Sequence, residues 1–318
     1  MVHQIHEIHH VLIKYLMNLC SQPVICCLGV MGTPASHPAS EAANHAPMWV
    51  LHVAHVLEMR KMQPHETLKA QKLLMKWNRN MLTIFVSHQW LRGDHPDPKE
   101  QKLRVLQGLL RNLIDKKLRI ECDVVSHFHG GKVCESELER VAEAYIWLDY
   151  FCVPQQKARS PESAEEQLEY IQCIPTYVNL SDVFLALVPK ANHLDTDVPC
   201  TMHSWLQRGW CRTELWCKYL SSRPNSPVIV VKGEDMVQAT MPLWQRYPVH
   251  SGDFAIEDDR ASCTLVIQKA LTQYISQLRE DGYRTAYLLY LSLYEEMTGL
   301  PKKKRTMEEF LQDFAFRI

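Results

Sequence analysis

The chain has 318 residues, of which 46% are hydrophobic and 22% are charged, and its formal net charge is −1. This composition is typical of a globular protein and excludes general disorder. A net charge near zero provides no long-range field that would recruit nucleic acid or a membrane surface, so neither is an expected partner. The eleven cysteines lie mostly within apolar runs, and their odd number favours reduced thiols in a reducing compartment such as the cytoplasm.

Residues 1–47 are interpreted as an accessory segment that ends in a linker, because the stretch 32–47 is rich in Pro, Ala and Ser. The most apolar part of this segment, 11–31, is interrupted by Lys14 and Pro23 among other residues. No run of roughly twenty apolar residues remains, so we expect no membrane span.

The body of the chain alternates between short apolar runs and helical patterns. Strands are predicted at four apolar runs, 83–87, 145–150, 183–188 and 228–231. Helices are predicted between them, over 98–117, 135–144, 161–180 and 205–222. Continuous apolar strands are typical of a parallel sheet that is covered on both faces. This alternation predicts a doubly wound α/β domain over 81–235.

Helical extensions are predicted on both sides of the α/β domain. Before it lies a helical lead-in, 48–80, with helices expected over 49–62 and 65–77. After it lies a C-terminal extension, 236–318, with helices expected over 260–297 and 307–316.

Polar and aromatic side chains follow the first two predicted strands of the domain. Ser87, His88 and Trp90 follow the first strand, and Asp149 and Tyr150 end the second. Ligands of open parallel sheets bind at the carboxyl ends of the strands, so we expect a binding site here. Each of these side chains also has a structural interpretation, as a cap or as an internal hydrogen-bonding partner.

The segment GWCRTELWC, at 209–217, contains two tryptophans, two cysteines and a single carboxylate. Its spacing predicts an amphipathic helix in the crossover after the third strand, where Glu214 would join the strand-end residues. Two interpretations of Glu214 remain open, an active-site carboxylate and an ion pair with Lys218 or Arg212. Trp210 is interpreted either as a base-stacking residue or as a core anchor of the helix.

Three motifs together resemble a known family. They are FVSHQW at 85–90, WLDYFCVPQ at 147–155 and RGWCRTE at 208–214. The set resembles a Toll/interleukin-receptor-like (TIR-like) group common in unicellular eukaryotes, and the second motif also resembles the fungal heterokaryon-incompatibility (HET) domain. The resemblance covers the stretch from about 80 to 235.

The TIR-like resemblance implies a flavodoxin-like sheet, a signalling role, self-association through the domain, and in many members hydrolysis of NAD at the nicotinamide–ribose bond. The WCxxE spacing maps the catalytic glutamate of the family onto Glu214. NAD is then a substrate, and no cofactor is expected. Nicotinamide is already a cationic leaving group, so an ionised carboxylate that stabilises the oxocarbenium-like transition state is sufficient. Ser87, His88, Trp90, Asp149 and Tyr150, together with Trp210, are the predicted substrate-binding residues.

Two alternatives to an NAD hydrolase stay open, a non-enzymatic TIR/HET-like interaction module and a metal-stabilised enzyme of unrelated chemistry. Four possible zinc ligands, Cys122, His127, His129 and Cys134, lie within thirteen residues. Their spacing matches none of the common zinc-finger patterns, so we favour a surface insertion without metal.

A short basic run lies close to the C-terminus. It consists of Lys302, Lys303, Lys304 and Arg305. The run resembles a nuclear import signal, and the alternative is a solvated basic turn before the last helix. We therefore expect a cytoplasmic protein with a possible nuclear location.

Overall fold

A computed structural model describes residues 46–128, 130–155, 161–223, 226–241 and 244–300. Its centre is a sheet of seven strands, β1 (Trp49–His52), β2 (Leu74–Lys76), β3 (Thr83–Ser87), β4 (Tyr145–Trp147), β5 (Val183–Leu187), β8 (Val228–Val231) and β9 (Val237–Thr240). Their spatial order is β2-β1-β4-β3-β5-β8-β9. The fold is therefore α/β, with a mixed and mostly parallel sheet.

The four inner strands are parallel, as the apolar runs predicted. Phe85 on β3 lies opposite Trp147 on β4 and opposite Phe184 on β5. Every residue of β3, β5 and β8 is buried, which explains why β5 and β8 are apolar throughout and why β3 is apolar apart from its two terminal residues, Thr83 and Ser87. The second strand is shorter than predicted, because a short helix, α7 (Asp149–Cys152), begins directly after Leu148.

The outer strands were not predicted. The expected helix over 49–62 is wrong, because this stretch forms β1 and then α2 (Val53–Glu58). The expected helix over 65–77 is confirmed only for α3 (His65–Ala70), because the rest of the stretch turns and forms β2. Strand β1 pairs antiparallel with both β2 and β4, and these pairings override the helical spacing of its apolar residues. On the opposite edge β9 pairs antiparallel with β8.

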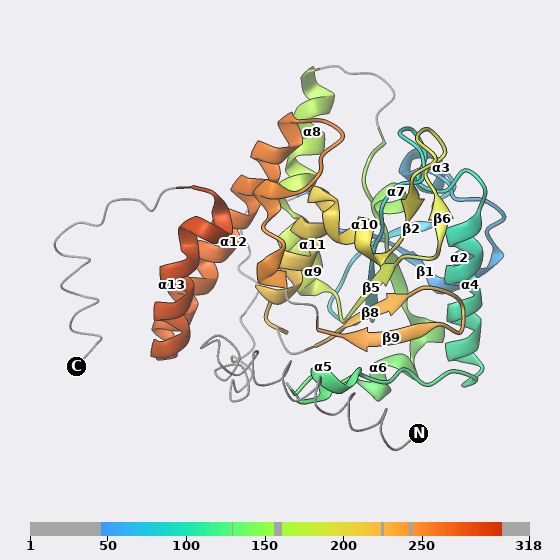
Figure 1. Cartoon of the computed structure of the whole chain (residues 1–318). Helices are drawn as coiled ribbons and strands as arrows, with labels where there is room; N and C mark the ends of the chain where they lie inside the picture. Colours follow the sequence, from blue (N-terminus) through green and yellow to red (C-terminus); the bar gives the residue numbers. More distant parts are fainter. Residues whose placement is uncertain (1–45, 129, 156–160, 224–225, 242–243, 301–318) are drawn as a thin grey trace, which may run out of the picture.

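Helices cover both faces of the sheet, as expected for this class. Figure 1 shows α2 and α4 (Gln101–Ile114) on one side, and α9 (Ile174–Leu180) and α11 (Gly209–Tyr219) on the other. Several predicted helices are divided in the structure. The pieces are α6 (Glu135–Leu138) with η2 (Val141–Glu143), α8 (Pro161–Gln172) with α9, and α10 (Met202–Gln207) with α11. The last break occurs at Arg208, whose backbone is extended.

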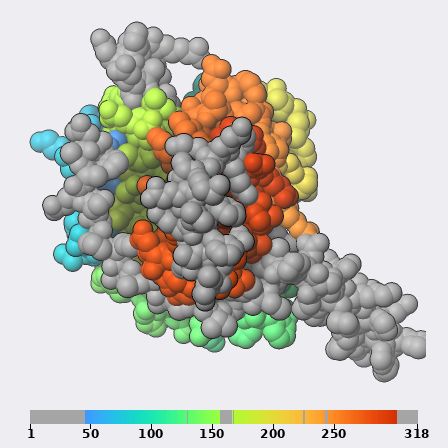
Figure 2. Space-filling view, turned by 90° about the vertical axis from the view of Figure 1, so that its left-hand side faces the viewer, coloured from blue at the N-terminus to red at the C-terminus, as the bar shows by residue number. Residues whose placement is uncertain are grey.

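The remaining elements are small, apart from two long C-terminal helices. The small elements are α5 (Val124–Phe128), β6 (Ala191–Asn192), β7 (Pro199–Cys200), η3 (Trp244–Arg246) and η4 (Val249–Ser251). Helix α12 (Asp258–Glu280) packs on α11, and α13 (Arg284–Thr298) packs on α12. Figure 2 shows this pair, in orange and red, on one outer face of the molecule.

The two long helices confirm the helical pattern predicted over 260–297. The expected helix over 307–316 and the basic run at 302–305 lie outside the described residues, as does most of the accessory segment. Among the described residues, no helix is both long enough and apolar enough to cross a membrane.

Candidate functional site

Glu214 and Ser87 meet at the carboxyl end of the central strand. Ser87 is the last residue of β3, and Glu214 lies in the middle of α11. The hydroxyl of Ser87 donates to Glu214 Oε2 over 2.5 Å, and Trp205 Nε1 on α10 donates to Ser87 Oγ over 3.0 Å. The whole of Ser87 and Trp205 is buried, and Glu214 is only 8% exposed. The tryptophan therefore fixes the hydroxyl that holds the carboxyl.

Helix α11 is buried on nearly all sides, which explains why Glu214 is inside the protein. Cys211, Leu215 and Trp216 are buried with it, and the amino end of the helix packs closely against Phe254. A Cβ atom at Gly209 would overlap the ring of Phe254, so only glycine fits there. The helix that carries the carboxyl is thus enclosed between the sheet and the C-terminal segment.

The ion-pair interpretation of Glu214 is wrong. Lys218 is buried, and its ammonium donates instead to the backbone carbonyl of Arg223 over 2.6 Å. The guanidinium of Arg212 donates to the carbonyls of Leu206 and Pro248, over 2.7 and 2.9 Å. Both cations therefore hold backbone segments in place, and within the described residues no cation pairs with the Glu214 carboxyl.

Burial dominates the ionisation of Glu214. Desolvation and the nearby charge of Asp149 raise its pKa to about 8, although the hydrogen bond from Ser87 acts in the opposite direction. Glu214 is therefore mostly protonated at neutral pH in this conformation.

Asp149 has a very different environment at the start of α7. It accepts hydrogen bonds from His88 Nε2, Trp90 Nε1 and the Tyr150 amide, over 2.9, 2.8 and 2.6 Å. Burial raises the pKa of Asp149, but His88 and these hydrogen bonds outweigh that effect, so the pKa lies below its ordinary value. Its side chain is 34% exposed. Asp149 is therefore an ionised carboxylate that remains accessible to solvent.

The strand-end residues form one cluster, as the sequence predicted, except for Trp210. The ring of Tyr150 packs edge-on against Trp90, with centroids 5.7 Å apart, and against His95, with centroids 5.1 Å apart. Trp210 points elsewhere, and its Nε1 donates to Asp259 on α12 over 3.0 Å. Trp210 therefore anchors the C-terminal helix, which favours its structural interpretation.

Lys102 is a member of this region that the sequence analysis missed. It is 1% exposed, and its ammonium donates to the backbone carbonyl of Gln89. Burial lowers the pKa of Lys102 to about 8, partly offset by charges that include Asp149. A signal for it exists in the sequence, because Lys102 falls on the same helical stripe as the buried residues Leu106, Leu109 and Leu113.

The possible zinc ligands lie elsewhere, near α5. Cys122 Sγ contacts the carbonyl of Gly131 at 3.5 Å, and Cys134 Sγ contacts Ser136 Oγ at 3.2 Å. His129 lies outside the described residues. Among the residues that the structure does describe, no three His, Cys, Asp or Glu side chains are grouped so that they could hold a metal ion.

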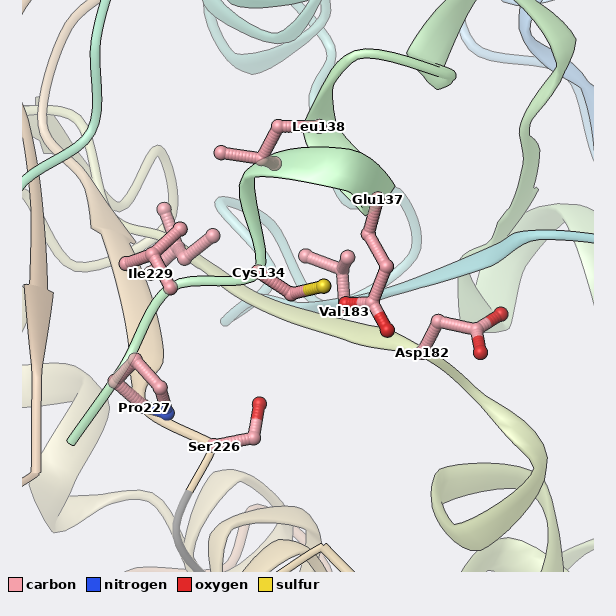
Figure 3. A pocket seen from close by; sticks show the side chains of 9 residues that line it. Cys134, Glu137, Leu138, Asp182, Val183, Ser226, Pro227 and Ile229 are labelled. Atoms are coloured by element: carbon pink, nitrogen blue, oxygen red, sulfur yellow. The ribbon is translucent and has the colours of Figure 1, made fainter. Parts of the chain in front are cut away.

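A hollow lies at the amino ends of the parallel strands, where β5 and β8 begin. Figure 3 shows Cys134 and Glu137 among its lining side chains, with Asp182 next to Glu137. Both carboxylates already pair with Arg223, over 2.8 and 3.0 Å. The length of the parallel strands separates this hollow from their carboxyl ends, where Ser87 and Glu214 lie. The hollow is therefore not part of the Glu214 region.

Comparison of the chain with known proteins gives no relative. No protein-family model, no curated protein and no solved structure matches it.

Proposed function

We propose that the chain is a TIR-like signalling protein that hydrolyses NAD at the nicotinamide–ribose bond, with Glu214 as the catalytic carboxylate. The observation that carries the proposal is a buried carboxyl that no cation among the described residues neutralises, held by Ser87 at the end of a central parallel strand. A buried carboxyl without a cationic partner is costly, and such costs are typical of functional sites.

The strand order supports a flavodoxin-like assignment for the domain. The parallel strands lie in the order β4-β3-β5-β8. After β3 the chain therefore adds β4 on one side of β3, and it then crosses to the other side to add β5 and β8. In doubly wound folds, ligands bind outside the carboxyl ends of the strands where the order reverses. Ser87 ends β3 at this point, and Glu214 lies in the crossover that follows β5.

A cationic substrate suits the charge of this site. Nicotinamide joined to ribose is positively charged, and a cation beside Glu214 would favour its ionised form and lower its pKa. The ionised carboxylate then stabilises positive charge that develops on the ribosyl carbon as the bond to nicotinamide breaks. Asp149 adds a second negative charge in the same region, and the raised pKa of Glu214 includes its effect.

The aromatic cluster provides a surface for the substrate. Trp90 is partly exposed, packs against the buried ring of Tyr150 and lies beside the partly exposed side chain of Asp149. The ring of Trp90 would stack on a base, and the carboxylate would accept from ribose hydroxyls. Because Glu214 is only 8% exposed, its covering side chains must move before a substrate reaches it. Self-association of the domain would supply the free energy for such an opening.

The proposal is tested by incubating the full chain with NAD and measuring nicotinamide by chromatography. We expect Glu214→Gln to reduce the release at least ~100-fold, because the amide carries no charge to stabilise the transition state. Glu143→Gln is the matched control, since the side chain of Glu143 is 73% exposed and lies far from the sheet edge that holds Ser87. Equal release by the wild type and Glu214→Gln would reject the assignment.

One observation favours the second candidate, a non-enzymatic interaction module. Helix α5 exposes three large apolar side chains, Val124 (64% exposed), Val125 (41% exposed) and Phe128 (75% exposed). Exposed apolar side chains that lie together mark interaction surfaces. If the module interpretation holds, Phe128→Ser lowers the oligomeric mass measured by light scattering, while the wild type releases no nicotinamide from NAD.

A further inference from the structure

The two carboxyl groups of the site differ in the number and type of their hydrogen-bond donors. Asp149 accepts from three N–H groups and is partly exposed. Glu214 accepts from one hydroxyl and is buried. N–H donors stabilise an ionised carboxylate, whereas a buried carboxyl with a single neutral partner keeps its proton. The site therefore pairs a carboxylate with a carboxylic acid.

We propose that Glu214 also acts as a proton donor, so that the site cleaves N-ribosides with neutral leaving bases, such as purine ribonucleotides, in addition to NAD. This inference rests on the proposed function, because it uses the same ribosyl-binding site. It adds a substrate class that differs from NAD in one respect. A purine must gain a proton to leave, whereas nicotinamide leaves as a neutral base without one.

The proton and the electrons balance in this reaction. The proton of Glu214 moves to a ring nitrogen of the base while the bond from the ribosyl carbon to the base breaks, and its electron pair stays with the base. Water then forms a bond to the ribosyl carbon and returns a proton to the Glu214 carboxylate. Asp149 stays ionised throughout and stabilises the ribosyl cation. The products are the free neutral base and ribose phosphate.

The groups around Glu214 leave it as the main proton donor. Besides Asp149, the titratable groups that interact with it in the described part of the chain include three buried thiols, those of Cys211, Cys217 and Cys263. Burial raises the pKa of each thiol, so all three stay neutral in the physiological range. Lys102 faces Asp149 and Cys211, and burial lowers its pKa to about 8. Lys218 lies one turn beyond Glu214 on α11, where burial lowers its pKa to about 7 and its ammonium donates to the carbonyl of Arg223.

Opposite pH profiles for the two substrates follow from this arrangement. The pKa of Glu214 is about 8, so the acid form that a purine nucleotide requires is lost above this pH. The carboxylate that NAD requires is formed over the same range. For the purine substrate we expect kcat/KM to fall about tenfold per pH unit above the pKa of Glu214. For NAD we expect kcat/KM to rise about tenfold per pH unit below this pKa and to level off above it.

The test measures base release from NAD and from adenosine monophosphate by the full chain, between about pH 6 and pH 10. Opposite profiles, with both activities reduced at least ~100-fold in Glu214→Gln, are the expected result. If the opposite pH slopes of the two activities persist in Lys102→Met, the group that titrates is Glu214 and not Lys102. NAD cleavage without adenine release, or two profiles that rise together, would overturn the inference and leave the proposed function intact.

Two further outcomes separate the two proposals. Adenine release without NAD cleavage would reject the proposed function and retain the proton-donor role. No release from either substrate would reject both. A readout that does not depend on activity is the infrared band of a protonated carboxyl, which should be present near neutral pH and absent in Glu214→Gln. Its presence at equal intensity in the variant would overturn the inference.

Discussion

Replacing Glu214 with glutamine should stabilise the folded protein, and the effect should grow as the pH rises. The carboxyl has an ordinary pKa of 4.5 when exposed and a pKa of about 8 in the folded protein. Between these values the folded state binds the proton more tightly than the unfolded state. Raising the pH through this window therefore removes stability from the wild type, and the uncharged amide of Glu214→Gln does not suffer this loss.

The expected magnitude follows from the size of the pKa shift. One pH unit corresponds to about 1.4 kcal/mol, so a shift from 4.5 to about 8 gives about 5 kcal/mol across the window. At pH 7 the wild type has already lost about 3 kcal/mol of its free energy of unfolding relative to low pH. Glu214 is 8% exposed, so solvent screening reduces this value little. The effect is a large fraction of the stability of a typical domain.

Urea unfolding of the wild type and Glu214→Gln at a series of pH values measures this difference. Other titrating groups, including Lys102 and Lys218, are common to both proteins and cancel in the comparison. Glu143→Gln, at a side chain that is 73% exposed, is the control for the loss of a carboxylate from the surface. A constant offset between the wild type and Glu214→Gln from about pH 5 to pH 9 would refute the argument that the buried carboxyl is protonated.

Two other substitutions test the surroundings of the site. Burial lowers the pKa of Lys102 from 10.5 to about 8, so the wild type gains about 3 kcal/mol as the pH rises through this range. Urea unfolding should therefore show that Lys102→Met becomes less stable relative to the wild type as the pH rises between these values. A relative stability that stays constant would contradict the burial of the ammonium. Trp210→Phe removes the hydrogen bond to Asp259 and should cost about 1 kcal/mol in thermal unfolding without changing NAD cleavage. A loss of activity that exceeds the loss of folded protein would show that Trp210 contacts the substrate.

The parallel centre of the fold could be predicted because its strands are buried on both faces. Residues 84–86, 183–187 and 228–231 are apolar throughout, and this pattern leaves few alternatives. The edges could not be predicted in the same way. Residues 49–52 combine a tryptophan with aliphatic side chains that fit a helix equally well, and only pairing with β4, about a hundred residues later, makes them a strand.

Most residues of the site were predicted, although Lys102 was missed and Trp210 lies elsewhere, but their contacts were not predicted. Ser87, His88, Trp90 and Asp149 could be proposed as site residues because ligands of parallel sheets bind at the carboxyl ends of the strands. The hydrogen bond from Ser87 to Glu214 joins residues separated by 127 positions, and no local pattern reveals it. The helical spacing alone made a pair of Glu214 with Lys218 equally reasonable, because the sequence does not show that α11 is enclosed by the C-terminal segment.

The central claim is that the Glu214 carboxylate cleaves NAD, and nicotinamide release tests it most directly. The measurement compares the full-length wild type with Glu214→Gln at equal folded fraction, near pH 8, where about half of Glu214 is ionised. The account predicts steady release by the wild type and at least a ~100-fold slower release by the variant. Release at the same rate from both proteins, or from neither, would contradict it.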